Sequence, residues 1–267
     1  MMTTFRERVA IVTGASSGIG RALATALAKQ HAHVVLFARR AEKLHSLAAS
    51  LPGDHLVVPG DVTNTADVQR AVDTAIQRFG RIEILVNNAG VGYCGTVEQT
   101  SLEEFRHIFE TNFFGAFHFT RAVAPHMSER RSGLIIQISS LNGFCAIPLG
   151  SAYCASKFAL EAMSQSARLE LHKHNVHVLI VRPGVTDTDF FDHSKYFHER
   201  NPFPLRNLMS ADDAAAKILR AALRRRREIV LGSDGKMLWW LKKLSPRLTD
   251  RILLYYAKAR PAVMDPV

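Results

Sequence analysis

The chain has 267 residues, of which 47% are hydrophobic and 22% are charged, a composition that allows one large domain or two small ones with a sizeable core. It has no run of the roughly 20 apolar residues that cross a membrane and no apolar signal core before its first strand, so we expect a cytoplasmic protein. The net charge of +10 is concentrated between Lys217 and Arg260, where there are 13 Lys and Arg but only 3 Asp and Glu, so the rest of the chain is neutral overall.

Neither the cysteines nor the histidines indicate a metal site. Cys94, Cys145 and Cys154 have no metal-ligand spacing, and we interpret them as reduced thiols in a reducing compartment. The 12 histidines show no zinc-enzyme spacing either. We therefore expect no bound metal.

The chain begins with a strand, a glycine-rich turn and a helix. Residues 8–13 contain the apolar run VAIV, the turn reads TGASSGIG, and RALATALAKQ has helical periodicity. Glycines let the backbone approach a pyrophosphate, and the helix N-terminus supplies N–H donors. This order predicts a dinucleotide cradle formed by Gly14, Ser16, Ser17, Gly18, Ile19 and Gly20.

The second predicted strand, at residues 33–38, ends at two arginines. A carboxylate at this point would bind the free 2′-hydroxyl of NAD(H), but the chain has Arg39 and Arg40 instead. Arg39 is placed to pair with a 2′-phosphate, and Arg40 is the second candidate. NADP(H) is therefore preferred over NAD(H). The alternative is that both arginines only cap the edge of the strand in solvent.

Strands and helices continue to alternate. We expect helices at 41–51 and 64–79, the second with Thr63 or Asn64 as its cap, and strands at 56–60 and 82–86. Asp61 follows a strand and could reach an adenine amino group. The next strand runs into the loop Asn87, Asn88, Ala89 and Gly90, and a loop at the carboxyl end of a central parallel strand lies beside the cofactor.

The middle of the chain completes the sheet. Residues 101–127 predict one long helix with the polar Asn112 among apolar neighbours, and the strand 134–138 ends at Ser139 and Ser140. A helix at 151–172 and a strand at 176–181 follow. Six alternations of strand and helix predict an α/β fold, a Rossmann-type doubly wound parallel sheet of about seven strands with helices on both faces.

Tyr153 and Lys157 are four residues apart on the predicted helix 151–172 and therefore share a face. An ammonium near a phenol is expected to lower the phenol pKa. A tyrosine tuned in this way exchanges a proton with an alcohol or a carbonyl near neutral pH. Taken alone, the pair could equally be a surface Tyr and a surface Lys.

The pattern changes after Pro183. Residues 186–209 are aromatic and aperiodic, which predicts a substrate loop inside a single domain of residues 1–235. Ser210 caps a predicted helix over 211–227, and EIVLG is a short last strand. Residues 236–267 predict a basic amphipathic helical extension, interrupted at Pro246, with one apolar face of Met237, Leu241, Leu244, Leu248, Ile252 and Tyr255.

Six separated motifs together resemble the classical short-chain dehydrogenases/reductases over roughly residues 6–231, and the chain is similar to steroid- and retinol-type members. They are TGASSGIG, NNAG, Asn112, Ser140, YCASK and PGVTDT. The resemblance implies that Tyr153 is the general acid/base, that Lys157 lowers its pKa and holds the nicotinamide ribose, and that Asn112 anchors a relay water. It selects Ser140, thirteen residues before the tyrosine, and leaves Ser139 structural. It also implies further cofactor contacts at Asp61, Val62, Asn88, Ala89, Gly90, Pro183, Gly184, Thr186 and Thr188.

These residues predict an NADP-dependent oxidoreductase of hydrophobic substrates. The site would interconvert a steroid, retinoid or other lipid-like alcohol and its ketone or aldehyde, with Ser140 and Tyr153 bonding the substrate oxygen. One alternative is a reductase of acyl chains on a carrier protein; another is a non-catalytic cofactor-sensing protein, but the Ser, Tyr and Lys that such a protein would lack are all present. The loop aromatics either line the substrate site or only pack the loop: Phe190, Phe191, Tyr196, Phe197 and Phe203.

Partners are predicted from the long helices and the basic extension. The resemblance implies a homodimer or a homotetramer. The extension either caps the substrate pocket, contacts a subunit, or lies on an anionic membrane surface with its aromatic residues, Trp239, Trp240, Tyr255 and Tyr256. The basic run RAALRRRR lacks a readout module, so we expect no nucleic acid partner.

Overall fold

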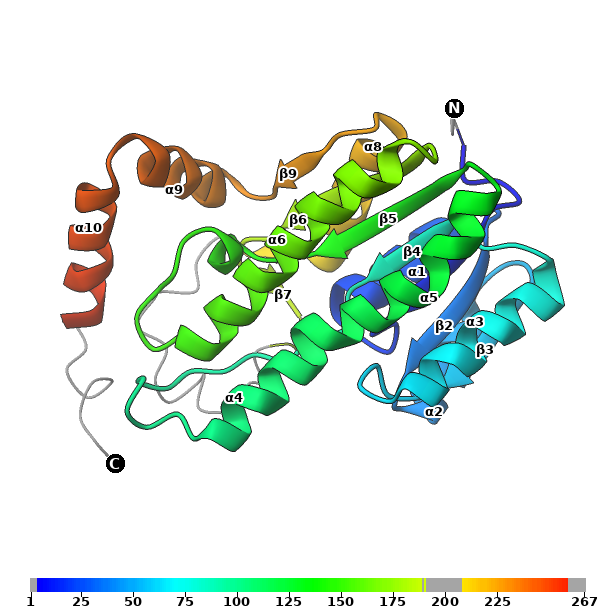
Figure 1. Cartoon of the computed structure of the whole chain (residues 1–267), viewed down its shortest axis with the longest axis horizontal. Coiled ribbons are helices and arrows are strands. Elements are labelled where there is room, and N and C mark those ends of the chain that lie inside the picture. The colour runs from blue at the N-terminus through cyan, green and yellow to red at the C-terminus, as the bar shows by residue number, and fades with distance from the viewer. Residues whose placement is uncertain (1–3, 189, 191–207, 259–267) are drawn as a thin grey trace.

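The computed structural model describes residues 4–188, 190 and 208–258. Its centre is a seven-stranded parallel sheet in the order β3-β2-β1-β4-β5-β6-β9, with helices on both faces (Figure 1). The doubly wound fold predicted from the alternation is therefore confirmed. The strands are β1 Val9–Thr13, β2 His33–Ala38, β3 His55–Pro59, β4 Ile84–Asn87, β5 Gly133–Ile138, β6 Val176–Arg182 and β9 Glu228–Val230.

The helices agree with the periodic segments of the sequence. They are α1 Gly18–Lys29, α2 Ala41–Ser50, α3 Thr65–Phe79, α4 Leu102–Phe109, α5 Gly115–Glu129, α6 Ser151–His172, α8 Ala211–Leu223, α9 Ser233–Leu244 and α10 Pro246–Lys258. Asn64 caps α3 by accepting from two backbone N–H groups, and Ser210 caps α8 through the N–H of Asp213. These caps satisfy donors that a helix leaves unpaired.

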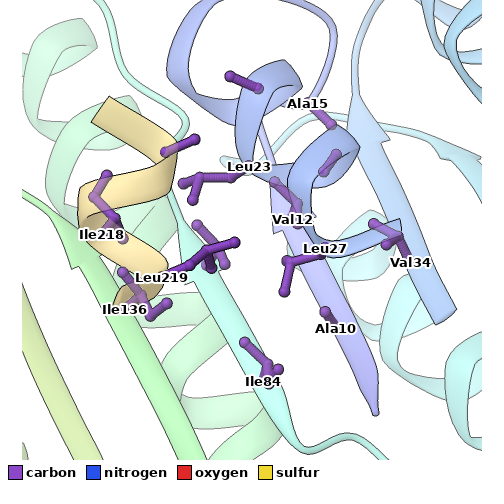
Figure 2. Close-up of a cluster of buried hydrophobic side chains, with 14 of the residues drawn as sticks. Ala10, Val12, Ala15, Leu23, Leu27, Val34, Ile84, Ile136, Ile218 and Leu219 are labelled. Carbon is purple, nitrogen blue, oxygen red and sulfur yellow. The ribbon is translucent and has the colours of Figure 1, made fainter. Parts of the chain in front are cut away.

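The sheet buries one set of side chains on each face because neighbouring strand residues point in opposite directions. Val34 and Leu36 belong to the core under α1 and α8, whereas Val35 and Phe37 belong to the core under α3 and α5. Figure 2 shows the first core, where α8 and α1 meet over the central strands. Residues labelled there come from β1, the turn after it, β2, β4, β5 and both helices: Ala10, Val12, Ala15, Leu23, Leu27, Val34, Ile84, Ile136, Ile218 and Leu219.

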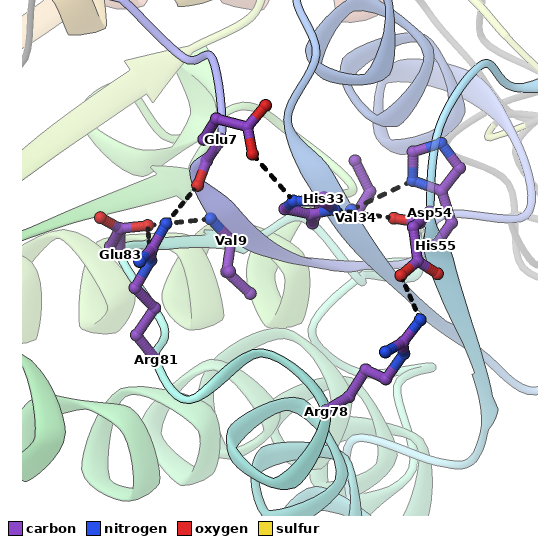
Figure 3. A network of polar contacts seen from close by, with 9 residues as sticks. All are labelled: Glu7, Val9, His33, Val34, Asp54, His55, Arg78, Arg81 and Glu83. Atoms are coloured by element: carbon purple, nitrogen blue, oxygen red, sulfur yellow. Dashed lines mark hydrogen bonds and ion pairs between the residues drawn. The ribbon is translucent and has the colours of Figure 1, made fainter.

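Polar contacts join the amino ends of the strands, at the edge of the sheet opposite the one where a Rossmann fold binds its ligand. Buried Glu83 pairs with Arg8 and Arg81 and accepts from the N–H of Val9 at 3.0 Å. Arg78 pairs with Asp54, as Figure 3 shows together with the contacts around His33 and His55. This network ties β1, β2, β3 and β4 together without using any predicted site residue.

Two predicted helices differ in detail from the sequence indication. Residues 102–129 are helical throughout, as predicted for 101–127, but the segment η1 Glu110–Phe114 between α4 and α5 is a π-helical turn. The helix predicted over 211–227 ends at Leu223, and Arg225 has a φ of 50°. Four consecutive arginines, residues 224–227, repel one another, and they form a turn before β9 rather than extend the helix.

The two short strands β7 Thr186–Asp187 and β8 Met209–Ser210 pair with each other and bracket the predicted substrate loop. Of its five aromatic residues, only Phe190 lies within the described residues. Phe191, Tyr196, Phe197 and Phe203 lie outside them. The described part of the chain contains no helix long and apolar enough to cross a membrane.

Candidate active site

The turn after β1 has the geometry of a phosphate cradle. Gly14 and Gly18 have φ values of 65° and 54°, which side chains rarely adopt. A Cβ on Gly20 would lie 2.4 Å from both the Gly14 carbonyl oxygen and the Asn88 Nδ2 atom. Helix α1 begins at Gly18, and Ser17 at its N-cap makes no side-chain cap bond, so N–H groups of the first turn remain available. These features fit the pyrophosphate of a dinucleotide.

The loop after β4 is bonded to the turn after β1. The hydroxyl oxygen of Thr13 accepts from the N–H groups of Asn88 and Ala89 at 2.9 and 3.1 Å. The Asn88 amide donates to the carbonyl oxygens of Thr13 and Gly14 at 3.0 and 3.3 Å. Asn88 therefore fixes the shape of the glycine turn. Thr13 was not among the predicted site residues, although its place at the end of a central strand could have suggested it.

The two arginines after β2 have different surroundings. Arg40 reaches over the glycine turn and donates to the hydroxyl oxygens of Ser16 and Ser17, each at 3.0 Å. The Arg39 side chain is 67% exposed, and its guanidinium lies 4.0 Å from the Asp61 carboxylate. The sequence favoured Arg39, but Arg40 is the arginine that contacts the cradle.

Asp61 and Val62 lie at the carboxyl end of β3, on the same edge of the sheet. One Asp61 carboxylate oxygen accepts from the N–H and the hydroxyl of Thr63, both at 2.9 Å. Val62 is buried in the core, and its carbonyl oxygen lies 3.2 Å from the His118 Nδ1 atom. The loop conformation thus leaves the Asp61 carboxylate half exposed beside Arg39.

Asn112 lies in the π-helical segment, and its side chain is buried and fully bonded. Its Oδ1 atom accepts from the Val91 N–H at 2.7 Å, and its Nδ2 atom donates to the Val91 carbonyl and the Ser156 hydroxyl at 3.0 and 3.1 Å. A Cβ on Gly90 would lie 3.1 Å from Asn112 Oδ1 and 3.7 Å from Lys157 Nζ. Asn112 therefore joins the β4 loop to α6 next to the lysine, and π-helical turns of this kind are frequent at functional sites.

Ser140 and Tyr153 face each other at the carboxyl end of β5. Their hydroxyls share a hydrogen bond, and the Ser140 Oγ atom also accepts from the Asn142 N–H at 3.1 Å. The Ser139 hydroxyl instead donates to Glu161 at 2.9 Å. Consecutive strand residues point to opposite faces, so only Ser140 reaches Tyr153.

Burial raises the pKa of Tyr153 to about 12, and its hydrogen bond with Ser140 offsets this only in part. The prediction that Lys157 lowers this pKa is therefore wrong for the structure. The Lys157 Nζ atom lies 5.9 Å from the centre of the Tyr153 ring and donates to the Ile138 carbonyl at 3.0 Å. Desolvation of the phenolate outweighs the distant ammonium. Tyr153 is thus a neutral phenol at neutral pH, which is the form that donates a proton.

Lys157 is buried beside a buried ion pair. Burial lowers the pKa of Lys157 to about 8, although the carboxylate of Glu161, one helical turn further along α6, raises it. Glu161 accepts from Arg182 at 2.7 and 2.6 Å through both of its oxygens. Arg182 also pairs with Glu228 at 2.9 Å. Glu161 and Arg182 were not predicted, although Tyr153, Lys157 and Glu161 recur every four residues on one helix face.

The segment after β6 closes the site. The Pro183 carbonyl oxygen accepts from the N–H of Leu141 at 3.2 Å, and the Thr186 hydroxyl donates to the Gly184 carbonyl at 3.3 Å. A Cβ on Gly18 would lie 3.2 Å from the Thr188 side chain, so this segment meets the start of α1. The predicted cofactor residues that follow five of the parallel strands, β1, β2, β3, β4 and β6, therefore lie along one edge of the sheet.

Apolar side chains surround Tyr153. Tyr93, Ile108 and Ala152 form a buried cluster against which the Tyr153 ring packs. The ring of Phe190 is centred 6.1 Å from that of Tyr153. No group of three or more His, Cys, Asp or Glu within the described ranges could hold a metal ion. The arrangement provides a proton donor beside an apolar surface, next to a dinucleotide cradle.

The fold and this site define a dinucleotide-dependent oxidoreductase, and comparison with known proteins gives its family. Residues 8–197 match the family model for short chain dehydrogenase. The chain belongs to this family of oxidoreductases, whose members use NAD(H) or NADP(H).

Individual relatives agree with this assignment. The chain is 36% identical over 255 residues to the uncharacterized oxidoreductase YxnA of Bacillus subtilis, covering 93% of this chain and 72% of that protein. A short-chain dehydrogenase from Streptomyces avermitilis superposes with a TM-score of 0.80 at 32% identity, over 91% of this chain and 95% of the other. A 3-ketoacyl-(acyl-carrier-protein) reductase from Brucella melitensis, complexed with NADH, gives 0.78 at 27% identity, over 85% and 98%.

Proposed function

We propose that this protein is an NADP(H)-dependent oxidoreductase that interconverts a hydrophobic alcohol and its ketone or aldehyde. The observation that carries the proposal is the position of Tyr153, whose hydroxyl is bonded to Ser140 and whose ring packs against an apolar cluster and Phe190. An apolar wall around a single pair of hydroxyls favours a lipid-like substrate such as a steroid or a retinoid.

The roles of the residues follow from their positions. The Ser140 and Tyr153 hydroxyls bind the substrate oxygen, and Tyr153 donates its proton as negative charge develops there during reduction. Lys157, with a pKa of about 8, is mostly protonated at neutral pH and supports the return of a proton to Tyr153. Asn112 holds the β4 loop against α6 beside Lys157. The bound nicotinamide dinucleotide would supply or accept the hydride.

The substitution Tyr153→Phe tests the proposal. It removes only the proton donor, so we expect the turnover of hydrophobic carbonyls to fall by about 10²- to 10⁴-fold with NADPH binding unchanged. Turnover is followed by NADPH absorbance over a panel of steroid, retinoid and short-chain carbonyls. Tyr93→Phe is the matched control, because Tyr93 lies in the same apolar cluster and its hydroxyl donates to Glu104. Retained activity in Tyr153→Phe would refute the mechanism.

The preference for NADP(H) is supported by the two arginines after β2. Arg40 lies across Ser16 and Ser17, and Arg39 lies beside Asp61, so both guanidiniums flank the place where an adenosine ribose would sit. We expect Arg40→Ala to raise the KM for NADPH by about 10- to 100-fold, from the loss of a charge-assisted hydrogen bond. Arg39→Ala should act in the same direction.

The KM for NADH should change little in both variants. Arg121→Ala, at an exposed arginine of α5, is the control and should leave both KM values unchanged. Equal changes in the KM values for NADPH and NADH would refute the preference for NADP(H). NAD(H) is the alternative cofactor, since the Brucella melitensis reductase is complexed with NADH.

A second candidate substrate class is an acyl chain attached to a carrier protein. The name of the Brucella melitensis reductase and the basic C-terminal segment favour it, because acyl carriers are acidic. Turnover of free hydrophobic carbonyls separates the two classes. Activity only on carrier-bound ketoacyl chains would replace the first substrate class with the second.

We also propose a cytoplasmic homodimer or homotetramer. The three cysteines are free and buried, which fits a reducing compartment. Exposed apolar side chains along the long helices favour contacts between subunits: Phe114, Phe117, Phe158 and Leu169. Size-exclusion chromatography with light scattering measures the assembly.

A further inference from the structure

The helices α9 and α10 carry an unusual concentration of exposed apolar side chains. Of the fifteen large hydrophobic residues that are exposed among the described residues, seven lie between residues 237 and 256. A contiguous apolar surface on a folded protein marks an interaction site. The seven are Met237, Trp240, Leu244, Leu248, Leu254, Tyr255 and Tyr256.

This concentration does not come from helices that fail to pack. On α10, Thr249, Leu253 and Ala257 are buried at four-residue intervals, so this helix has an inner face. On α9, a Cβ at Gly235 would lie 3.0 Å from Leu141, so α9 begins against the segment that follows Ser140. The extension is therefore attached to the body through α9, and α10 packs against α9.

The opposite side of each helix is apolar at its centre. Met237, Trp240 and Leu244 follow at three and four residues on α9 and are 69%, 57% and 78% exposed. Leu248 and Tyr255, two turns apart on α10, lie opposite its buried residues. We call these five residues the outer face. Figure 1 shows α9 and α10 continuing from β9 past the edge of the sheet.

Basic residues flank the outer face. Lys236, Lys243, Arg247 and Arg251 are exposed, and Lys243 lies over the Trp239 ring at 3.7 Å. Lys236, Arg247 and Arg251 make no ion pair within the described ranges, whereas Lys242 pairs with Asp250 at 3.0 Å and joins the two helices. These three cations therefore have no acidic partner in the part of the chain that the structure describes.

We propose that the outer face docks the protein on an anionic phospholipid surface. Apolar and aromatic side chains enter the headgroup boundary while flanking Lys and Arg bind anionic headgroups, and this chemistry matches the observed pattern. A second copy of the chain fits less well, because a two-fold interface would place the same unneutralised cations opposite one another. Since no described helix can span a bilayer, the association is confined to the surface.

Vesicle co-sedimentation of the full chain tests the proposal. Wild-type protein is mixed with phosphatidylcholine vesicles that contain or lack about one-third phosphatidylserine. We expect binding only to the anionic vesicles, and weaker binding at high salt. The charge reversal Arg247→Glu with Arg251→Glu should lower the partition coefficient at least tenfold. The triple substitution Trp240→Ser, Leu244→Ser and Tyr255→Ser should do the same through the apolar centre.

Matched controls use the same chemistry at other places on the surface. Arg224→Glu with Arg226→Glu reverses two exposed charges in the arginine turn before β9, and Val97→Ser removes an apolar residue of the loop before α4 that is 76% exposed. Both controls should bind like wild type. All variants should keep the wild-type melting temperature and oligomeric state, because the changed side chains are exposed.

Three results would overturn the proposal. The first is no binding of wild-type protein to anionic vesicles at low salt. The second is an equal loss in the arginine-turn control, which would mean that net charge and not this face is responsible. The third is a change in oligomeric state of the triple variant in the absence of lipid, which would assign the face to a second copy.

Discussion

The body of the protein and its two C-terminal helices use apolar residues in opposite ways. In the body, two helix layers cover the sheet, and Leu27, Val34 and Ile136 are wholly buried. In the extension, α9 begins against Leu141 of the body and α10 packs against α9, and Leu244 and Tyr255 are more than 70% exposed. A sheet needs cover on both faces, whereas a helix on the surface needs it on one. The contrast agrees with the proposal that the extension serves for contact with a partner, while the body provides the site.

The ion pairs of the body and of the extension also differ in burial. In the body, the charged side chains of Glu161 and Arg182 are 5% exposed and satisfy each other. In the extension, Lys242 and Asp250 pair at the surface, with 30% and 60% of their side chains exposed. Water screens the second pair but not the first. The following experiments use this difference.

The largest effect is expected from breaking the buried ion pair. Arg182→Met leaves the Glu161 carboxylate buried without its partner, so we expect the free energy of unfolding to fall by about 3–5 kcal/mol. Lys242→Met breaks the surface pair of the extension and should cost at most about 1 kcal/mol. Urea denaturation of both variants measures the two values. Similar losses would mean that the two regions do not differ as described.

A smaller effect of opposite sign is expected at Lys157 in the candidate active site, where a substitution should raise the free energy of unfolding. Burial holds the pKa of Lys157 at about 8 instead of its usual 10.5. Between pH 8 and 10.5 the unfolded chain therefore binds more protons than the folded chain. The free energy of unfolding of the wild type thus rises with pH over this range. Below pH 8, the buried charge lowers the free energy of unfolding by roughly 3 kcal/mol. Lys157→Met removes this cost and one hydrogen bond of about 1 kcal/mol. We expect a gain of about 2 kcal/mol at pH 7.

Denaturation of wild type and Lys157→Met at pH 7, 8, 9 and 10 checks this expectation. The variant should lose the rise in stability above pH 8, and it should also lose catalytic activity. A variant that is less stable than wild type at pH 7 would show that Lys157 stabilises the fold. The expected trade of stability for function is typical of active sites.

Much of the fold and of the candidate site follows from the sequence by itself. The apolar runs, the glycine turn and the helical period are local signals, so the strands and the bounds of α6 at residues 151–172 were predicted from them. The four-residue spacing of Tyr153 and Lys157 places them on one helix face regardless of what surrounds the helix. The parallel sheet then brings the ends of β1, β4, β5 and β6 to one edge because every strand runs the same way.

Other properties were decided only by the tertiary structure, because they depend on groups distant in sequence. Burial under segments far along the chain raises the Tyr153 pKa, although its neighbour Lys157 predicted the reverse. The fold brings Arg40, and not Arg39, onto Ser16 and Ser17, a choice that two adjacent arginines cannot reveal. It also leaves Leu244 and Tyr255 in solvent, since a period of 3.6 residues defines an apolar face but not what the face meets.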